Sequence, residues 1–483
     1  MKRIIFFIAF SCSILPATSC SGKDIPSKSG DTPPVNPVIT NYGNIDEWLT
    51  RSDKSALLSQ SRLSFNDASP QTAAIEIDSA TKYQQVDGFG FCLTDASAYL
   101  ISQMSATDRA NLLKELFATD GNNIGISYLR VSIGASDLSK NVYSYDDISG
   151  GQTDSLLNHF SIDGTATATD LIPVLKDILA INPDIKILGS PWSAPAWMKD
   201  NNATKGGSLL QKYFGSYASY FVKYIRAMKA AGITIDAITP QNEPLNPDNN
   251  PSMYMTAEEE RDFIKHNLGP AFRQANLDTK IWVYDHNCDH PEYATTILAD
   301  PEAAQYVAGS AFHLYAGDIS ALGTVHNAYP DKNVYFTEQY TGSSGTFGGD
   351  LTWAIRNLIV GASQNWSKNV LEWNLASDPG LSLHTDGGCN TCLGAVTIDG
   401  NHVARNQSYY IIAHASKFVR PESYRIASTS VSNISSVAFL TPDGKKVLVA
   451  VNTSNATQSF NIKFKGHTAL ANLDAGAVAT FVW

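Results

Sequence analysis

The chain has 483 residues, 43% of them hydrophobic, which is more than one hydrophobic core usually holds, so two domains are expected. Its formal net charge of −11 argues against nucleic acid or an anionic membrane as a partner, because both repel a negatively charged protein. Aromatic residues make up 10% of the chain, and such a composition is compatible with a neutral glycan, which is indifferent to the charge.

The first twenty residues have the pattern of an export signal. A basic start is followed by an apolar run at 4–10 and by small residues before Cys20. Lipidation of Cys20 would make the protein a bacterial cell-surface or periplasmic lipoprotein, whereas ordinary signal cleavage would leave it secreted. No apolar run approaches the ~20 residues of a membrane-spanning helix. Residues 21–42 contain several serines and prolines and are expected to form a flexible linker.

An alternation of strand-like and helical patterns predicts a barrel domain at 85–418. Short apolar runs rich in β-branched residues alternate with amphipathic stretches, which implies parallel strands joined by helices. The strand-like runs are 86–93, 126–133, 186–192, 235–240, 280–284, 309–315, 333–337 and 368–373. The helical stretches are 105–118, 170–181, 211–231, 256–275, 320–328 and 350–364. Eight strands over about 290 residues fit an α/β fold of the (β/α)₈ TIM-barrel type.

The two ends of the chain are expected to form a second, β-rich domain. Four short alternating runs follow residue 419, at 435–440, 446–452, 459–464 and 477–483, and turn signals separate them. This pattern is typical of antiparallel β-structure. The N-terminal segment 43–84 contains a further strand-like stretch at 62–78. We expect that segment to pair with the strands of 419–483 and to complete a side β-sandwich.

Polar and aromatic side chains gather where the predicted barrel strands end. A TIM barrel carries its active site at the face to which the carboxyl ends of its strands point. In chain order the strand ends offer Asp95, Arg130, Trp192, Asn242 with Glu243, Asp285 with His286, His313 with Tyr315, Glu338, and Trp373 with Asn374. The sequence therefore predicts one functional site assembled from all eight strands.

Glu243 and Glu338 are candidates for a pair of catalytic carboxylates. They end the fourth and seventh predicted strands, which nearly face one another across the barrel, so the two side chains could flank a bound sugar. Hydrolysis of a glycosidic bond with retention needs two carboxylates about 5–5.5 Å apart, one as acid/base and one as nucleophile. We assign Glu243 as the acid/base, with a raised pKa. The neighbouring Asn242 amide is a candidate to hold a sugar 2-hydroxyl.

Glu338 is assigned as the nucleophile, which has to stay ionised. That requirement calls for a cation or hydrogen-bond donors nearby. Arg130 is the candidate cation, and His313 and Tyr315 are candidate donors. On local sequence alone, Glu338 could instead be a salt-bridged strand terminus.

Three tryptophans could either stack on a sugar or fill the barrel. Trp192 and Trp197 lie in the segment SPWSAPAW at 190–197, where two prolines fix the turn. We expect both indoles to be presented to a ligand. Trp373 ends the eighth strand.

Cys389 and Cys392 are separated by two residues, a spacing found in zinc knuckles. No second Cys or His pair stands at a matching distance. In an exported protein a local disulfide is therefore favoured over free thiols, and free thiols over a metal site.

Six segments in register resemble glycoside hydrolase family 30. They are GFGFCLTDASA at 88–98, SPWSAPAWMK at 190–199, TPQNEP at 239–244, FHLY at 312–315, WNLA at 373–376 and KFVRP at 417–421. The resemblance implies a (β/α)₈ barrel with a side β-sandwich and retaining chemistry, with the acid/base on the fourth strand and the nucleophile on the seventh. It implies no metal and no organic cofactor. The sugar-contacting positions implied by the resemblance are Asp95, Arg130, Asp137, Trp192, Asn242, Tyr315 and Trp373.

Loop segments make the chain most similar to the endo-β-1,6-glucanase branch of that family. They are SYDD at 144–147, GQTD at 151–154, HFSI at 159–162 and VYDHN at 283–287. Asp285 and His286 follow the fifth strand and are expected to line the rim of the sugar pocket. The glucosylceramidase branch is close but differs around 284–287.

We therefore expect a monomeric hydrolase acting on a β-glucan polysaccharide or oligosaccharide. An exo-acting β-glucosidase or a glucosylceramidase-like enzyme of the same fold is the first alternative. A non-catalytic carbohydrate-binding barrel is the second, and it is disfavoured because both Glu243 and Glu338 are present.

Overall fold

The structure is a computed structural model that describes residues 43–67, 72–149 and 151–483. The expected signal at 1–20, the lipidation candidate Cys20 and the expected linker at 21–42 lie outside the described residues. Among the helices of the described part, none combines the length and the apolar character that crossing a bilayer requires.

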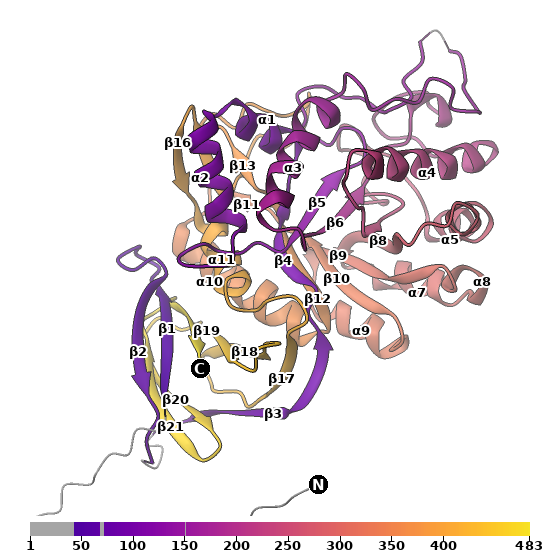
Figure 1. The fold of residues 1–483 in the computed structure, drawn as a ribbon. Coiled ribbons are helices and arrows are strands. Elements are labelled where there is room, and N and C mark those ends of the chain that lie inside the picture. Colours follow the sequence, from indigo (N-terminus) through magenta and orange to yellow (C-terminus); the bar gives the residue numbers. More distant parts are fainter. Residues whose placement is uncertain (1–42, 68–71, 150) are drawn as a thin grey trace, which may run out of the picture. The chain divides into compact units, whose positions relative to one another are not determined.

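Eight parallel strands close into a barrel, as the sequence predicts (Figure 1). Around the barrel they run in the order β10-β12-β4-β5-β6-β7-β8-β9. Their bounds are β4 (Gly88–Cys92), β5 (Tyr128–Ser132), β6 (Lys186–Ser190), β7 (Ala237–Ile238), β8 (Lys280–Cys288), β9 (Val307–Gly317), β10 (Asn333–Glu338) and β12 (Ser367–Asn374). Each strand overlaps one of the eight predicted runs, and β7 and β10 are the fourth and seventh barrel strands in the chain.

Helices follow most barrel strands. They are α1 (Asp95–Gln103), α2 (Ala106–Phe117), α3 (Ile172–Ile181), α4 (Phe214–Ala230), α5 (Ala257–Phe263), α6 (Gly269–Gln274), α7 (Pro291–Leu298), α8 (Pro301–Ala304), α9 (Ala321–Ala328), α10 (Phe347–Ala354) and α11 (Gln407–Ser416). All six predicted helical stretches are present, three of them with π-helical turns. The sequence did not predict α1, α7, α8 or α11. All ten residues of α11 are buried, so this helix has no exposed face to create a periodic pattern.

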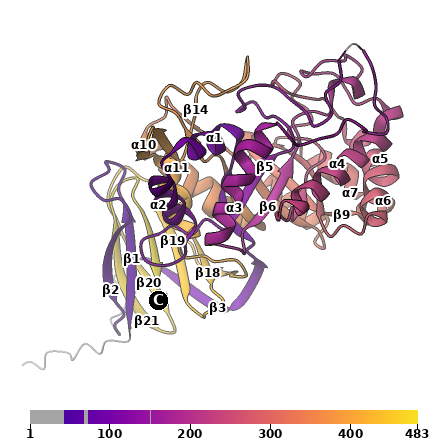
Figure 2. The same ribbon diagram turned by 45° about the horizontal axis from the view of Figure 1, so that its top comes forward.

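The side domain is one sheet of nine strands in the order β2-β1-β22-β19-β18-β17-β3-β20-β21. Its N-terminal strands are β1 (Asn44–Thr50), β2 (Ser59–Ser64) and β3 (Ala74–Gln85). Its C-terminal strands are β17 (Tyr424–Ser428), β18 (Ile434–Leu440), β19 (Lys446–Asn452), β20 (Gln458–Phe464), β21 (His467–Leu473) and β22 (Val478–Val482). In Figure 2 the indigo β1 and β2 lie beside the yellow C-terminal strands.

Strands from both chain ends build this sheet together, as expected. β1 pairs with β22, and β3 lies between β17 and β20. The expectation of purely antiparallel pairing is wrong at one place, because β3 runs parallel to β20. A strand delivered from the far end of the chain is free of the hairpin geometry that forces neighbouring strands to be antiparallel.

A buried histidine on α11 joins the barrel to the sheet. His414 Nε2 is 2.8 Å from Thr50 Oγ1 on β1, and its Nδ1 is 2.9 Å from Thr480 Oγ1 on β22. The Thr480 hydroxyl donates to the His414 carbonyl, so it accepts from Nδ1–H, and the Thr50 hydroxyl donates to Nε2. Burial lowers the pKa of His414 to about 3, in keeping with a neutral ring.

Replacing His414 by Leu should destabilise the fold by roughly 1–3 kcal/mol, because the Thr50 hydroxyl loses its acceptor, whereas the Thr480 hydroxyl keeps the backbone carbonyl of residue 414. The loss should be measured by urea unfolding. Because the histidine pKa is depressed in the folded state, its contribution is present above the ordinary pKa of 6.5 and is lost as pH falls toward 3. The difference in free energy of unfolding between wild type and variant should therefore be smaller at pH 4 than at pH 7.5. An equal gap at both pH values would contradict a neutral buried ring. The exposed His402, replaced in the same way, is the control.

Candidate active site

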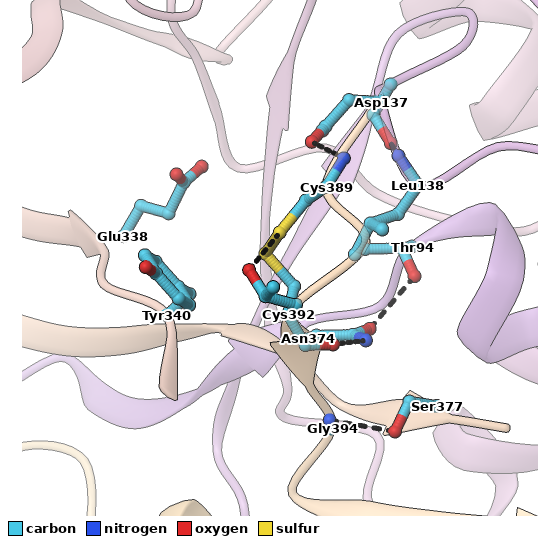
Figure 3. The surroundings of a disulfide bond; sticks show 12 residues. Thr94, Asp137, Leu138, Glu338, Tyr340, Asn374, Ser377, Cys389, Cys392 and Gly394 are labelled. Atoms are coloured by element: carbon cyan, nitrogen blue, oxygen red, sulfur yellow. Dashed lines mark hydrogen bonds between the residues drawn. A yellow bond between two sulfur atoms is a disulfide. The ribbon is translucent and has the colours of Figure 1, made fainter. Parts of the chain in front are cut away.

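A cavity of about 530 Å³ opens at the carboxyl ends of the barrel strands. Of the predicted site residues, it is lined by Asp137, Trp192, Glu243, His286, Tyr315, Glu338 and Trp373. Cys389 and Cys392 also line it, and they are joined in a disulfide (Figure 3). Arg130, Asn242, Asp285 and His313 are buried behind these residues and contact them, as described below.

The two candidate carboxylates meet in this cavity. Glu338 is the last residue of β10, and Glu243 follows β7, with its backbone N–H donating to the Asp285 carbonyl at 3.0 Å. One carboxylate oxygen of each glutamate and one nitrogen of His313 all lie within 4.8 Å of one another. That separation fits a retaining pair, at about 5–5.5 Å, and is too short for an inverting pair, at about 6.5–9.5 Å.

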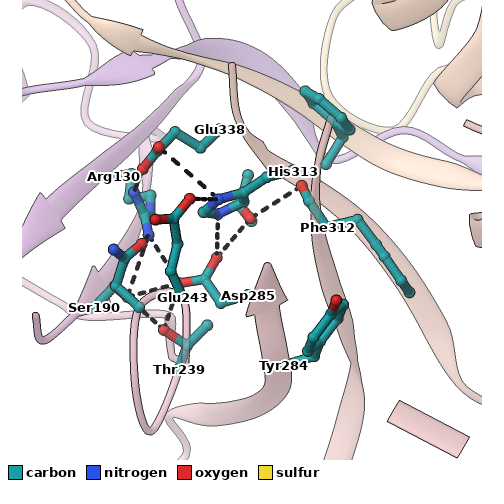
Figure 4. Close-up of polar contacts among 12 residues, drawn as sticks. Arg130, Ser190, Thr239, Glu243, Tyr284, Asp285, Phe312, His313 and Glu338 are labelled. Atoms are coloured by element: carbon teal, nitrogen blue, oxygen red, sulfur yellow. Dashed lines mark hydrogen bonds and ion pairs between the residues drawn. The ribbon is translucent and has the colours of Figure 1, made fainter. Parts of the chain in front are cut away.

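Arg130 holds Glu338 from inside the barrel (Figure 4). Its Nη1 donates to Glu338 Oε2 at 2.5 Å, and its Nη2 donates to Asp285 Oδ2 at 2.8 Å and to Asn242 Oδ1 at 2.6 Å. The guanidinium also lies 4.8 Å from the Trp192 ring centroid. The cation that the sequence proposed for the nucleophile is therefore in place, and Tyr315 supplies a second contact by donating its hydroxyl to Glu338 Oε1 at 2.9 Å.

Asp285 lies beneath the cavity and not at its rim, which corrects the sequence expectation. It is fully buried, and its two oxygens accept from Arg130, Ser190, Thr239 and Thr337 and face His313 Nε2 at 3.1 Å. The physical reason is an irregularity in β8: Tyr284 and Asp285 both have positive φ, and the register with β9 shifts between Tyr284 and His286. The Asp285 carboxylate is thereby turned into the barrel, so that of the pair Asp285 and His286 only His286 lines the cavity.

His313 connects three carboxylates. Its Nδ1 is 3.1 Å from Glu243 Oε1 and 3.8 Å from Glu338 Oε1, and its Nε2 is 3.1 Å from Asp285 Oδ1. Burial lowers the pKa of His313, but the charge of Glu338 and the hydrogen bonds to Asp285 and Glu243 outweigh it and raise the pKa to about 9. The raised pKa favours a protonated His313 ring that donates to these carboxylates, although Glu243, His313 and Glu338 also have the composition of a metal site.

The charges around the two glutamates differ from the sequence expectation. Burial raises the pKa of Glu243, but the hydrogen bond and charge of His313, helped by His286 and Asn246, lower it to about 2. This contradicts the raised pKa that the sequence analysis expects at Glu243. Burial raises the pKa of Glu338, against the opposing charges of His313 and Arg130. At this separation the two carboxylates titrate as a pair, so a proton held by the pair is shared between them.

Two predicted ligand contacts lie elsewhere. Asp95 begins α1, where its Oδ2 accepts from Ser139 and Tyr143, and it faces a separate cavity of about 300 Å³. Trp197 is buried outside the glutamate cavity, with its indole N–H donating to the Asp146 carbonyl at 3.0 Å and its ring against Tyr213. The core-filling alternative therefore holds for Trp197, whereas Trp192 and Trp373 line the cavity side by side, with ring centroids 5.2 Å apart.

Sequence reasoning missed the loop residues that complete the cavity. Asn246 donates its amide to Glu243 Oε2 at 2.8 Å, and the remaining lining residues include 245–249, Asn287, Asp289, His290 and Tyr340. Asn287 lies near the end of β8, and the others follow barrel strands for which the sequence predicts a functional residue at or near the end. Their position at or after the end of a barrel strand was the one sequence signal for these residues. Which of their side chains point into the cavity depends on how the loops fold.

Comparisons with known proteins agree with this geometry. Residues 86–419 match the profile described as "Glycosyl hydrolase family 30 TIM-barrel domain", and residues 422–481 match the "Glycosyl hydrolase family 30 beta sandwich domain". An endo-1,6-beta-D-glucanase of Neurospora crassa is 40% identical, over 76% of this chain and 79% of the relative. The lysosomal acid glucosylceramidase of Mus musculus is 30% identical, over 83% and 82%. A solved structure of an endo-beta1,6-glucanase superposes with a TM-score of 0.84 at 36% identity, covering 91% of this chain and 99% of the other.

Asp285→Asn should destabilise the protein by roughly 3–5 kcal/mol, because it leaves Arg130 and His313 as buried cations short of a partner. It should also lower the pKa of His313, since Asp285 is one of the groups that raise it. Urea unfolding and an NMR titration of the His313 ring measure the two effects. Asp289→Asn, at the exposed rim of the same cavity, should change stability by less than about 0.5 kcal/mol. An unchanged His313 pKa in the Asp285 variant would show that the buried pairing is not what holds its proton.

Proposed function

This chain belongs to glycoside hydrolase family 30, and on that premise we propose that it is a retaining endo-β-1,6-glucanase that works by double displacement. The observation that carries the proposal is the pair Glu243 and Glu338, with carboxylate oxygens within 4.8 Å of one another in a cavity walled by Trp192 and Trp373. The choice of a β-1,6-glucan is supported by the Neurospora crassa relative and by the superposed structure, both named for that activity.

In the first step Glu338 attacks the anomeric carbon while Glu243 protonates the departing glycosidic oxygen. Arg130 and Tyr315 hold the Glu338 carboxylate by one oxygen each, so its orientation is fixed before the sugar arrives. In the second step Glu243 takes a proton from water, which attacks the anomeric carbon and releases Glu338. The covalent intermediate is a glucosyl ester of Glu338.

The proton that Glu243 delivers has a nearby source. The pKa of His313 is raised to about 9 and its Nδ1 lies 3.1 Å from Glu243 Oε1, so transfer of a proton from Nδ1 would give neutral His313 and a carboxylic acid at Glu243. Binding of a sugar displaces water from the cavity, which favours this neutral pair over the ionised one. The low pKa of Glu243 is therefore compatible with its acid role.

An exo-acting β-glucosidase or a glucosylceramidase-like enzyme remains the second candidate function. The observation that favours it is the mouse lysosomal acid glucosylceramidase, 30% identical over most of both chains. A purely carbohydrate-binding role is disfavoured, because both glutamates face the cavity and each has its own hydrogen-bonded partners.

We also propose that the protein is exported, as a cell-surface or periplasmic lipoprotein or as a secreted enzyme. The signal-like first twenty residues and Cys20 support this proposal. The Cys389–Cys392 disulfide supports it independently, since such bonds persist in oxidising compartments.

Glu338→Gly should abolish glucan hydrolysis, because it removes the nucleophile, and azide should rescue it by taking its place on an activated β-glucoside and giving the α-glucosyl azide. The Glu243→Gly variant should turn over glucan roughly 10²–10⁴-fold more slowly than the wild type. Its turnover of an aryl glucoside with a good leaving group should fall much less. Azide should rescue that variant with the β-glucosyl azide as product. NMR of the products distinguishes the anomers. If the Glu338 variant gave the β-azide and the Glu243 variant the α-azide, Glu243 would be the nucleophile and Glu338 the acid/base.

The proposed specificity is tested by incubating the protein with pustulan, laminarin, xylan and glucosylceramide and sizing the products. Pustulan, a linear β-1,6-glucan, should give a ladder of oligosaccharides, and the other three should stay intact. Free glucose as the sole product would favour the exo-acting alternative. Glu338→Gln is the inactive control, and it should show no product while unfolding at the wild-type temperature within a few degrees.

A further inference from the structure

The loop that follows the eighth barrel strand carries the disulfide into the active-site cavity. This disulfide loop, residues 378–393, leaves the short strand β13 (Ala376–Ser377) and ends in β14 (Cys392–Leu393). β14 pairs with β11 (Thr341–Gly342), which follows the strand that ends in Glu338. The loop also reaches the segment after β7, where Asn250 donates its amide to the Asp386 carbonyl at 2.9 Å. It is therefore attached to several loops around the cavity.

Its closest attachment is to Asp137, which lines the cavity and comes from the loop after β5. The backbone N–H of Cys389 donates to Asp137 Oδ2 at 3.3 Å, and the backbone N–H of Thr385 donates to the Asp137 carbonyl at 2.9 Å. Gly388 packs so tightly that a Cβ there would lie 2.4 Å from the Asp137 carbonyl oxygen. The disulfide loop thus contacts both the backbone and the carboxylate of Asp137.

The disulfide closes a ring of four residues that ends at the donor of this hydrogen bond. Cys389 and Cys392 pack with Trp192 and Trp373, the two aromatic residues of the cavity wall. In Figure 3 the disulfide faces Glu338 and Tyr340, and Asp137 lies beside Cys389. The ring restricts the backbone that presents the Cys389 N–H, so the direction of that N–H depends on the disulfide.

We propose that the Cys389–Cys392 disulfide is a positioning element that holds Asp137 in its sugar-binding orientation and so sets the affinity of the site for glucan. The proposal rests on the proposed function. A buried carboxylate binds sugar hydroxyls best when its orientation is fixed, and the Cys389 N–H contributes to that fixation by donating to Asp137 Oδ2. Reduction by a dithiol converts the disulfide to two thiols and the dithiol to its own disulfide, and the loop is then free to turn the Cys389 N–H away.

The test compares the full-length wild type with Cys389→Ser/Cys392→Ser, each with and without Asp137→Ala, using a soluble β-1,6-linked gluco-oligosaccharide. Loss of the disulfide should raise KM roughly tenfold, the size of one hydrogen bond, and change kcat much less. In the Asp137→Ala background the same double substitution should raise KM little further, because its effect passes through Asp137. Dithiothreitol should reproduce the effect in the wild type and leave the serine variant unchanged.

Cys288→Ala is the matched control, since Cys288 is a buried free cysteine outside the cavity lining, and its KM and its response to dithiothreitol should equal those of the wild type. An unchanged KM in the serine variant, or an equal further rise in the Asp137→Ala background, would overturn the proposal. A wild type that cleaves only another glucan would refute the β-1,6 specificity alone, and the comparison would then be made on that glucan.

Hydrogen exchange gives a readout that needs no substrate. Amides at 385–392 and at 136–139 should exchange faster in the serine variant than in the wild type, because both segments share the hydrogen bonds described above. Unchanged exchange at 136–139 would show that the disulfide does not hold the Asp137 segment, whatever the enzyme cleaves.

Discussion

The Arg130 guanidinium, buried at the centre of the barrel mouth, binds Asp285 with one nitrogen and Glu338 with the other. A single cation thereby sets the position of the candidate nucleophile and of the carboxylate below it. His313 likewise bridges two carboxylates, with Nε2 against Asp285 and Nδ1 against Glu243. Arg130 and His313 thus lie among three largely buried carboxylates, and burial of these charges is tolerated because neighbouring groups carry the opposite sign.

The backbone is irregular where this cluster is assembled. Glu243, Tyr284 and Asp285 have φ values of 46°, 78° and 59°, a region that non-glycine residues rarely adopt. Glu260 on α5 supports the second of them by accepting the Tyr284 backbone N–H at 3.2 Å. Such strain persists where surrounding contacts over-determine the conformation, and here it aims two carboxylates inward from neighbouring strands.

Much of the fold and the core of the site could be predicted from the sequence, for definite reasons. The eight strands are buried apolar runs, and the carboxyl ends of parallel strands meet at one edge, so Glu243 and Glu338 had to lie near one another. The inward turn of Asp285 could not be predicted, because it depends on the irregularity in β8 and not on spacing. Asp95 and Trp197 failed for a related reason: each stands at a strand end or in the loop that follows it, but loop packing directs its side chain away from the cavity.

Electrostatics was the other limit of prediction. The raised pKa expected at Glu243 was inferred from its acid role, whereas the folded chain places His313 and Asn246 against its carboxylate and lowers the pKa. Both residues are visible in the sequence, and Asn246 is only three positions away. Their effect on the pKa of Glu243 depends on contacts of about 3 Å. A sequence pattern places the end of a strand only to within about 2–4 residues, so it cannot predict such contacts.

The mixed origin of the side sheet has a consequence for how the chain is made. β1 pairs with β22, and β3 lies between β17 and β20, so strands from the first and the last parts of the chain alternate within one sheet. During synthesis β1 and β3 are made hundreds of residues before their partners β22, β17 and β20, and they stay unpaired with them until the barrel has been synthesised. The sheet therefore closes only after β22 has been made. A ribosome that stops short of β22 releases a chain whose early strands keep open edges, the state in which β-structure is most prone to aggregate.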